Sequence, residues 1–161
     1  MSLRAVTGWL ALAGIAVAGY LTYVHYAELQ PLCVGGGGGC ERVQSSPWAE
    51  LGGVPVALLG LLAYATVLAS LALPEALGRS PAAFVSLVGF GFSAWLTYVE
   101  LAKIGAVCQW CVASALVMTA LAAVSVARLL RDGHKGRGAS SERPKRSTAA
   151  SATDAPAATS Q

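Results

Sequence analysis

The sequence predicts an all-α membrane protein with four transmembrane helices, and three observations support this fold class. The chain of 161 residues is 55% hydrophobic and only 12% charged, whereas an ordinary soluble domain carries about twice that charge. Four apolar stretches, 6–26, 54–73, 81–101 and 106–130, are long enough to cross a bilayer, which takes about 20 residues. None of these stretches has a charged residue near its middle. We therefore expect one transmembrane domain over residues 1–130.

The basic residues orient the predicted helices. Of the 11 Lys and Arg residues, only Arg42 and Lys103 fall outside the cytoplasm when the N-terminus is placed inside. This bias follows the positive-inside rule, so we expect a multi-pass protein of the inner or plasma membrane with both termini in the cytoplasm. The net charge of +3 then reflects topology, and we expect no nucleic-acid partner.

The first stretch ends in an aromatic cluster, 20–26, suited to the membrane–water interface. Arg4 and the Ala-Val-Ala sequence at 16–18 resemble a signal peptide with its cleavage site, but the apolar run is longer than a signal core. We therefore favour a retained transmembrane helix.

The outer loop, 27–53, carries Cys33 and Cys40 on either side of five consecutive glycines, 35–39. The glycine run is typical of a flexible tether between two thiols that move relative to each other. Serine followed by proline and tryptophan at 45–48 predicts a short interfacial helix in this loop, because serine caps a helix and proline suits its first position.

The remaining connections follow from composition. The link at 74–80 is short and carries Arg79, which is typical of a cytoplasmic hairpin between the second and third helices. Residues 131–161 are basic at first and then rich in Ser, Ala and Thr, so we expect a disordered cytoplasmic tail.

Cys108 and Cys111 form a Cys-x-x-Cys motif at the start of the fourth apolar stretch. Residues three apart share one helical face, and roughly 4.5 Å of axial rise between them is within the reach of a disulfide. A thiol in the first helical turn is also near unpaired N–H groups, which favour the reactive thiolate. The motif therefore indicates redox chemistry.

The predicted topology places all four cysteines at the outer face, where disulfides persist. A four-thiol zinc site and two inert structural disulfides are the alternatives. We favour thiol–disulfide exchange between the pairs. The sequence contains no haem c motif and no flavin or nicotinamide fingerprint, so a lipid-soluble quinone is the remaining two-electron acceptor. Cys111 lies one turn deeper than Cys108 and is the thiol closer to such an acceptor.

These residues resemble the vitamin K epoxide reductase family, specifically its bacterial disulfide-forming members. The resemblance covers about residues 8–130. The matching pieces are Cys33 and Cys40, Ser45-Ser46-Pro47-Trp48, Gly53-Val54-Pro55, Leu96-Thr97-Tyr98 and Cys108-Gln109-Trp110-Cys111.

The resemblance implies a four-helix bundle around a quinone, menaquinone or ubiquinone, capped by the first outer loop. It implies that Cys33 engages the redox partner and that Cys40 passes electrons onward. Cys108 would exchange disulfides with Cys40, and Cys111 would contact the quinone. Ser46 matches the serine or threonine that the family keeps beside the loop cysteines and the quinone.

The implied function is a quinone-dependent thiol–disulfide oxidoreductase that reoxidises a separate extracytoplasmic thioredoxin-fold (DsbA-like) protein and so supports disulfide bond formation. Val112–Ala115 replaces the Thr-Tyr-Ala motif that vertebrate members use near their substrate, which leaves vitamin K quinone or epoxide reduction as an alternative function. A non-enzymatic metal-binding or scaffold protein is the alternative from another class. Tyr98, Glu100 and Trp110 are further candidates for the pocket, or for packing alone.

Overall fold

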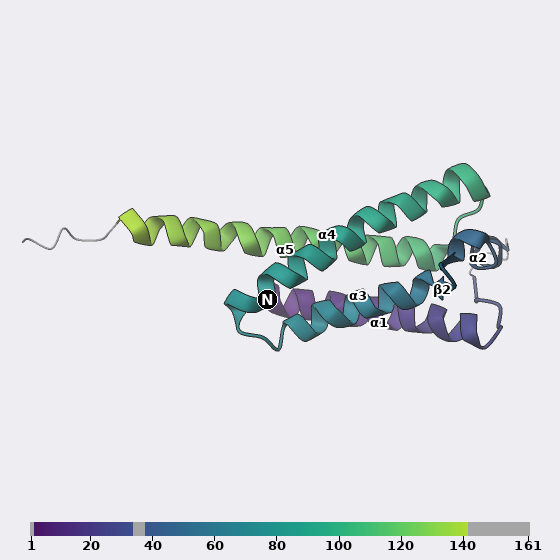
Figure 1. The fold of residues 1–161 in the computed structure, drawn as a ribbon, viewed down its shortest axis with the longest axis horizontal. Helices are drawn as coiled ribbons and strands as arrows, with labels where there is room; N and C mark the ends of the chain where they lie inside the picture. The colour runs from purple at the N-terminus through teal and green to yellow at the C-terminus, as the bar shows by residue number, and fades with distance from the viewer. Residues whose placement is uncertain (1, 34–37, 142–161) are drawn as a thin grey trace, which may run out of the picture.

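The computed structural model describes residues 2–33 and 38–141, and most of them are helical (Figure 1). The elements are α1 (Leu3–Tyr26), α2 (Gly39–Gln44), the 3₁₀ helix η1 (Pro47–Ala49), β1 (Glu50–Leu51), β2 (Val54–Pro55), α3 (Val56–Ser70), α4 (Glu75–Val99), the π-helix η2 (Glu100–Ile104) and α5 (Gln109–Ser141).

Four apolar helices form a bundle in which α1 packs against α3 and α5, and α4 packs against the same two helices. Small residues of α1 allow this close packing. Ala11 and Ala18 are buried beside Tyr64 of α3 and Leu121 of α5. The Tyr64 hydroxyl also donates a hydrogen bond of 2.8 Å to the Ser114 carbonyl, which joins α3 to α5 across the core. The helical fold class predicted from composition is confirmed.

The predicted count of four membrane spans is not confirmed. Within the described residues, three helical segments are long and apolar enough to cross a membrane, namely Leu3–Tyr26, Leu77–Ile104 and Gln109–Arg131. The stretch expected to span at 54–73 contains α3, which has only 15 residues and a length of roughly 22 Å. The first two residues of the predicted stretch, Val54 and Pro55, pair in the β1–β2 hairpin instead. Its last three residues, 71–73, follow α3 in a turn.

Two helix boundaries differ from the sequence prediction. Helix α4 begins at Glu75 rather than at 81, with Pro81 inside it. Helix α5 continues past Leu130 to Ser141, where a disordered tail from 131 onward was expected, and 142–161 lie outside the described residues. The basic segment lacks an apolar face, but this alone does not end a helix. A proline in a helix interior would break it, and the first proline after Leu130 is Pro144.

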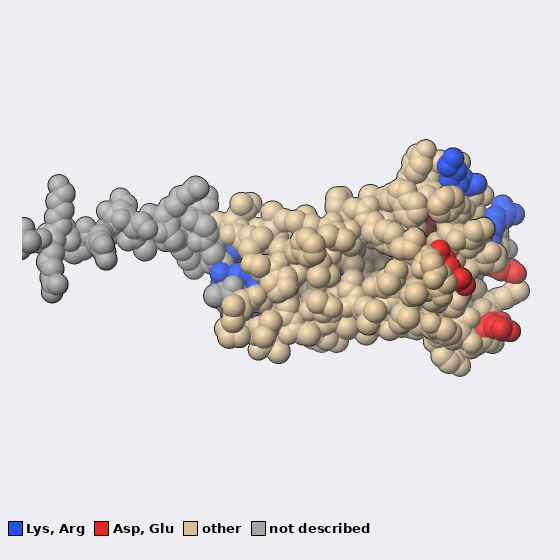
Figure 2. Space-filling model, viewed as in Figure 1, with Lys and Arg blue, Asp and Glu red and all other residues tan. Residues whose placement is uncertain are grey.

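Charged side chains gather at the two ends of the bundle, as Figure 2 shows for one face. Between the ends, this face is covered by uncharged residues along the length of the helices. Such an apolar middle between two charged ends is the surface expected of a bundle embedded in a bilayer.

The segment between α1 and α3, expected to be the outer loop, forms a small cap over one end of the bundle, built from α2, η1 and the β1–β2 hairpin (Figure 1). The short helix expected after Ser46 is confirmed as the 3₁₀ turn η1, with Pro47 at its start. Helix α2 is not predicted, because its segment begins in the glycine run. Residues 34–37 of the expected tether lie outside the described residues, whereas Gly38 and Gly39 open α2.

Candidate active site

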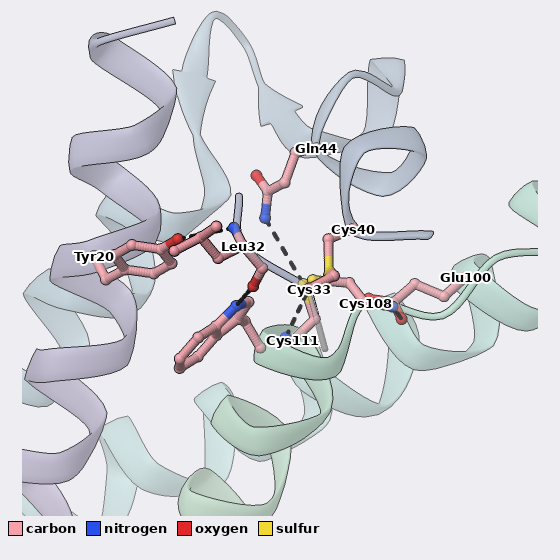
Figure 3. The surroundings of a disulfide bond; sticks show 9 residues. Tyr20, Leu32, Cys33, Cys40, Gln44, Glu100, Cys108 and Cys111 are labelled. Carbon is pink, nitrogen blue, oxygen red and sulfur yellow. Dashed lines mark hydrogen bonds between the residues drawn. A yellow bond between two sulfur atoms is a disulfide. The ribbon is translucent and has the colours of Figure 1, made fainter. Parts of the chain in front are cut away.

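The four cysteines lie together where the cap meets the start of α5 (Figure 3). Cys40 and Cys108 are buried in one cluster with Val43, and Cys33 and Cys111 pack against it. The outer segment and the Cys-x-x-Cys motif are about 70 residues apart in the sequence, so the fold alone brings them together. The structure thus gathers all four thiols that the sequence analysis singled out.

The two cysteine pairs are in different oxidation states. Cys33 and Cys40 form a disulfide, with their Cα atoms 6.3 Å apart. Cys108 and Cys111 are free thiols, and Cys108 is completely buried. The arrangement therefore holds an oxidised pair and a reduced pair side by side.

Cys108 is the N-cap residue of α5. Its carbonyl accepts the first intrahelical bond, 3.0 Å from the Val112 nitrogen, and its sulfur accepts the Cys111 N–H at 3.4 Å. Serine and aspartate oxygens usually take this position, because the first N–H groups of a helix have no intrahelical partner. At Cys108 the same N–H groups favour a negatively charged sulfur.

The neighbouring thiol adds to this effect. Cys108 immediately precedes the apolar segment that starts at Gln109. A hydrogen bond from the Cys111 thiol lowers the pKa of Cys108 to about 7, although burial opposes the shift. A substantial fraction of Cys108 is therefore thiolate at neutral pH, and the thiolate is the nucleophile of disulfide exchange.

Gly39 lets the cap approach this motif closely. A Cβ atom at this position would lie 2.7 Å from the carbonyl oxygen of Val107, the residue before Cys108. Any larger residue would push α2, and Cys40 with it, away from the start of α5. The glycine therefore has a packing role that the tether interpretation does not include.

The peptide group of Leu32, next to Cys33, is held from two sides (Figure 3). Its N–H donates to the Tyr20 hydroxyl at 3.0 Å, and its carbonyl accepts the Trp110 indole N–H at 2.8 Å. The two aromatic rings also contact each other, with centroids 5.0 Å apart. Helix α1 and the Cys-x-x-Cys motif thus fix the backbone that leads into the outer cysteine pair.

A cavity of about 390 Å³ lies beside the cysteines, between the four apolar helices and the cap. Most of its lining is apolar, including Leu21, Val85 and Met118. The polar groups that border it include Ser46, Gln44, Glu100 and Cys111. The Gln44 amide lies 3.9 Å from the Cys111 sulfur.

The other candidate residues from the sequence differ in whether they border the cavity. Ser46 borders the cavity, but its hydroxyl donates to the Val43 carbonyl at 2.7 Å. Glu100 borders the cavity as well, Trp110 holds Leu32, and Tyr98 is exposed. Sequence reasoning missed Tyr20 and Gln44, because neither belongs to a motif. Within the described ranges, no cluster of three or more His, Cys, Asp or Glu side chains has the geometry to hold a metal ion.

Comparison with known proteins agrees with this geometry. A model described as the vitamin K epoxide reductase family matches residues 5–126. A protein of Arabidopsis thaliana named thiol-disulfide oxidoreductase LTO1 is 30% identical over 118 residues. The aligned region covers 66% of this chain but only 31% of that protein, so the chain spans about a third of the length of this curated relative.

Proposed function

The chain belongs to the vitamin K epoxide reductase family, and we propose that it passes electrons from an extracytoplasmic thioredoxin-like protein, through its two cysteine pairs, to a membrane quinone. The family and the relative support a membrane thiol oxidoreductase. The partner, the electron path and the acceptor are parts of the proposal.

One observation carries the proposal: an oxidised and a reduced cysteine pair are packed in one cluster, and the reduced pair borders an apolar cavity. Two inert structural disulfides would not need a free pair with a stabilised thiolate. A relay needs both, because each exchange step requires one thiolate and one disulfide within contact distance.

The relay would proceed in two exchanges. A thiolate of the reduced partner attacks the Cys33–Cys40 disulfide at Cys33, and resolution of the mixed disulfide leaves the outer pair as a dithiol. Cys40 then attacks Cys108 in the oxidised form of the inner pair and releases Cys111, and Cys33 attacks Cys40 to release Cys108 and form the Cys33–Cys40 disulfide again. Each exchange transfers two electrons inward, and the second ends with Cys111 reduced at the edge of the cavity.

The cavity fits a quinone head group. Its volume of about 390 Å³ lies within the usual range for small-molecule sites, which are mostly apolar with a few polar groups that fix orientation. Ser46, Gln44 and Glu100, which border the cavity, would hold the polar edge of the ring. A bound quinone would supply the capacity to accept two electrons and two protons.

The proposal includes a topology. The cap, with its four cysteines, would face the outside, and the basic end of α5 would lie in the cytoplasm. A soluble partner then reaches Cys33 from water, while a quinone reaches the cavity from the lipid.

The test uses the purified full chain in lipid nanodiscs, with a reduced thioredoxin-fold protein as donor and a short-chain quinone as acceptor. We expect quinol to form with multiple turnovers in wild type. Cys111→Ala should lower the rate by at least about a thousand-fold, the scale seen when a nucleophile is removed.

Thr119→Ala is the matched control. Thr119 is exposed on the same helix, and its hydroxyl donates to the Ala115 carbonyl within that helix. Its rate should equal that of wild type. Wild-type protein whose thiols are oxidised by oxygen but never by quinone would overturn the proposed acceptor.

A further inference from the structure

Glu100 is the one buried side chain among the acidic residues whose side chains the structure describes, with 5% of its surface exposed. Its Oε2 atom accepts the N–H of Cys108 at 3.2 Å (Figure 3). The same carboxyl group borders the cavity, and so does the Cys111 side chain. A single carboxyl group therefore bonds the first residue of the inner pair and borders the cavity together with the second.

The backbone around Glu100 is built to make these contacts. Helix α4 widens into the π-helix η2 at Glu100, and the Glu100 carbonyl accepts the N–H groups of both Gly105 and Ala106. Gly105 then reverses the chain in the left-handed conformation, with φ of 64°. This returns Cys108 to a carboxyl group eight residues earlier, and π-turns of this kind are frequent at functional sites.

A buried carboxylate is costly unless hydrogen-bond donors surround it. In the reduced inner pair, the Cys108 N–H donates to Glu100, and the Cys111 S–H, at the border of the same cavity, is a further donor. When Cys111 enters a disulfide, its S–H group is gone and this further donor is lost. The nearest charged side chains on η2 and α2, Lys103, Glu41 and Arg42, are exposed to water and do not replace it.

We propose that Glu100 holds the proton of Cys111 for as long as Cys111 is oxidised, and returns it when Cys111 becomes a thiol again. The inference deepens the proposed function, on which it rests only for the identity of the electron acceptor.

The proton and electron balance of the step is as follows. The Cys108 thiolate, the Cys111 thiol and the Glu100 carboxylate become one disulfide, one carboxylic acid and two electrons. The two electrons go to the acceptor, a quinone in the proposed function, which takes its own two protons from water. In the return step Cys40 attacks Cys108, the S–S bond of the inner pair breaks, and the leaving Cys111 sulfur takes the proton from Glu100.

A purely structural role for Glu100 makes a different prediction. If the carboxyl group only caps the start of α5, any acceptor oxygen serves. Glu100→Gln keeps an acceptor oxygen for the Cys108 N–H but cannot carry a proton, so it separates the two roles.

The experiment is redox-difference infrared spectroscopy of the full chain in nanodiscs, starting from the state seen here, with the outer pair oxidised and the inner pair reduced. Diamide, a small thiol oxidant that takes two electrons from the thiols and two protons from water, oxidises the inner pair without any quinone. Wild type should lose S–H absorption and gain one C=O stretch of a protonated carboxylic acid per chain.

Glu100→Gln should lose S–H absorption without gaining the carboxylic acid band, and its inner pair should be oxidised about tenfold to a hundredfold more slowly, a typical scale for loss of a proton-transfer group. Glu100→Asp should keep a shifted band. Glu28→Gln, which removes an exposed carboxylate, should match wild type.

A wild-type protein without the band overturns the proposal, as does the same band in Glu100→Gln. The wild-type measurement stands even if the glutamine variant fails to fold. Since diamide replaces quinone here, a chain that shows the band but reduces no quinone would refute the proposed function and leave the role of Glu100 in place.

Discussion

Leu32 connects the two cysteine pairs through its peptide group. Leu32 is 78% exposed, so two hydrogen bonds hold this backbone beside the inner pair: its N–H donates to Tyr20, and its carbonyl accepts from Trp110. Trp110 is thus a positioning residue within the Cys-x-x-Cys motif, since it acts on Cys33 through its neighbour.

Trp110→Phe keeps an aromatic ring beside Tyr20 and removes the indole N–H. Water can replace the lost bond, so we expect unfolding stability to fall by less than about 1 kcal/mol. Exchange between the outer and inner pairs should slow by about threefold to tenfold, because the Cys33 backbone is no longer fixed. Rapid acid quench followed by alkylation and mass spectrometry measures this exchange.

Trp9→Phe provides the control, since Trp9 is exposed on α1 and far in sequence from both pairs. A Trp110→Phe protein that exchanges at the wild-type rate would show that the Leu32 contact has no kinetic role.

How well a residue of the site could be predicted depends on how far away its contact partners lie in the sequence. Cys108 and Cys111 can be predicted, because a spacing of three is itself the geometry of a helical pair. Glu100 is visible as an acid at the end of an apolar stretch, but its contact with Cys108 depends on the π-turn, which no local pattern of Glu100–Ile104 indicates. Tyr20 and Gln44 meet the motif only through tertiary packing, so sequence alone does not select them.

At the scale of elements, α2 is the part whose position most directly controls exchange. It carries Cys40 toward Cys108, and its first residue, Gly39, lies against the Val107 carbonyl. The cap could be predicted only in part. The glycine run predicts a tether, whereas its last two residues, Gly38 and Gly39, begin α2. The shortening of α3 was hidden for a similar reason, since Val54 and Pro55 are apolar in a hairpin as well as in a helix.

Gly39→Ala tests this contact. A methyl group at 2.7 Å from a backbone oxygen cannot be accommodated without moving α2, because backbone does not yield as a flexible side chain does. We expect exchange from Cys40 to Cys108 to slow by about tenfold to a hundredfold, since displacements near 1 Å can cost that much. The trapped Cys40–Cys108 disulfide formed by a Cys111→Ala background, resolved on non-reducing gels, reports the rate.

Gly91→Ala is the matched control for the glycine change. It lies in α4, and a Cβ atom there meets nothing within 4 Å, so exchange should stay at the wild-type rate. Equal exchange in Gly39→Ala and Gly91→Ala would mean that α2 does not set the approach of the two cysteines.

At the scale of the whole molecule, the bundle has a polarity that its individual helices do not show. The cap and all four cysteines sit at one end, and the N-terminus and the basic part of α5 extend from the other (Figure 1). Helix α3, at roughly 22 Å, is shorter than the roughly 30 Å hydrocarbon core. In the proposed topology, the β1–β2 hairpin and the turn after Ser70 would lie at membrane depth or thin the bilayer locally, while the longer α1, α4 and α5 would set the orientation.

Membrane topology follows from this polarity and can be measured without any activity. In a Cys108→Ser/Cys111→Ser background, Cys33 and Cys40 are bonded to each other, so a single added cysteine is the one free thiol. Leu29→Cys in the outer loop and Leu73→Cys between α3 and α4 place that thiol at exposed positions at opposite ends of the bundle. An impermeant maleimide applied to intact cells should label Leu29→Cys at once and Leu73→Cys only after permeabilisation. The proposed topology puts the N-terminal end of the bundle, where Arg and Lys predominate, in the cytoplasm. The reverse pattern would put both cysteine pairs in a reducing compartment, where a stable Cys33–Cys40 disulfide is not expected, and the proposed relay would then have no oxidised pair with which to begin.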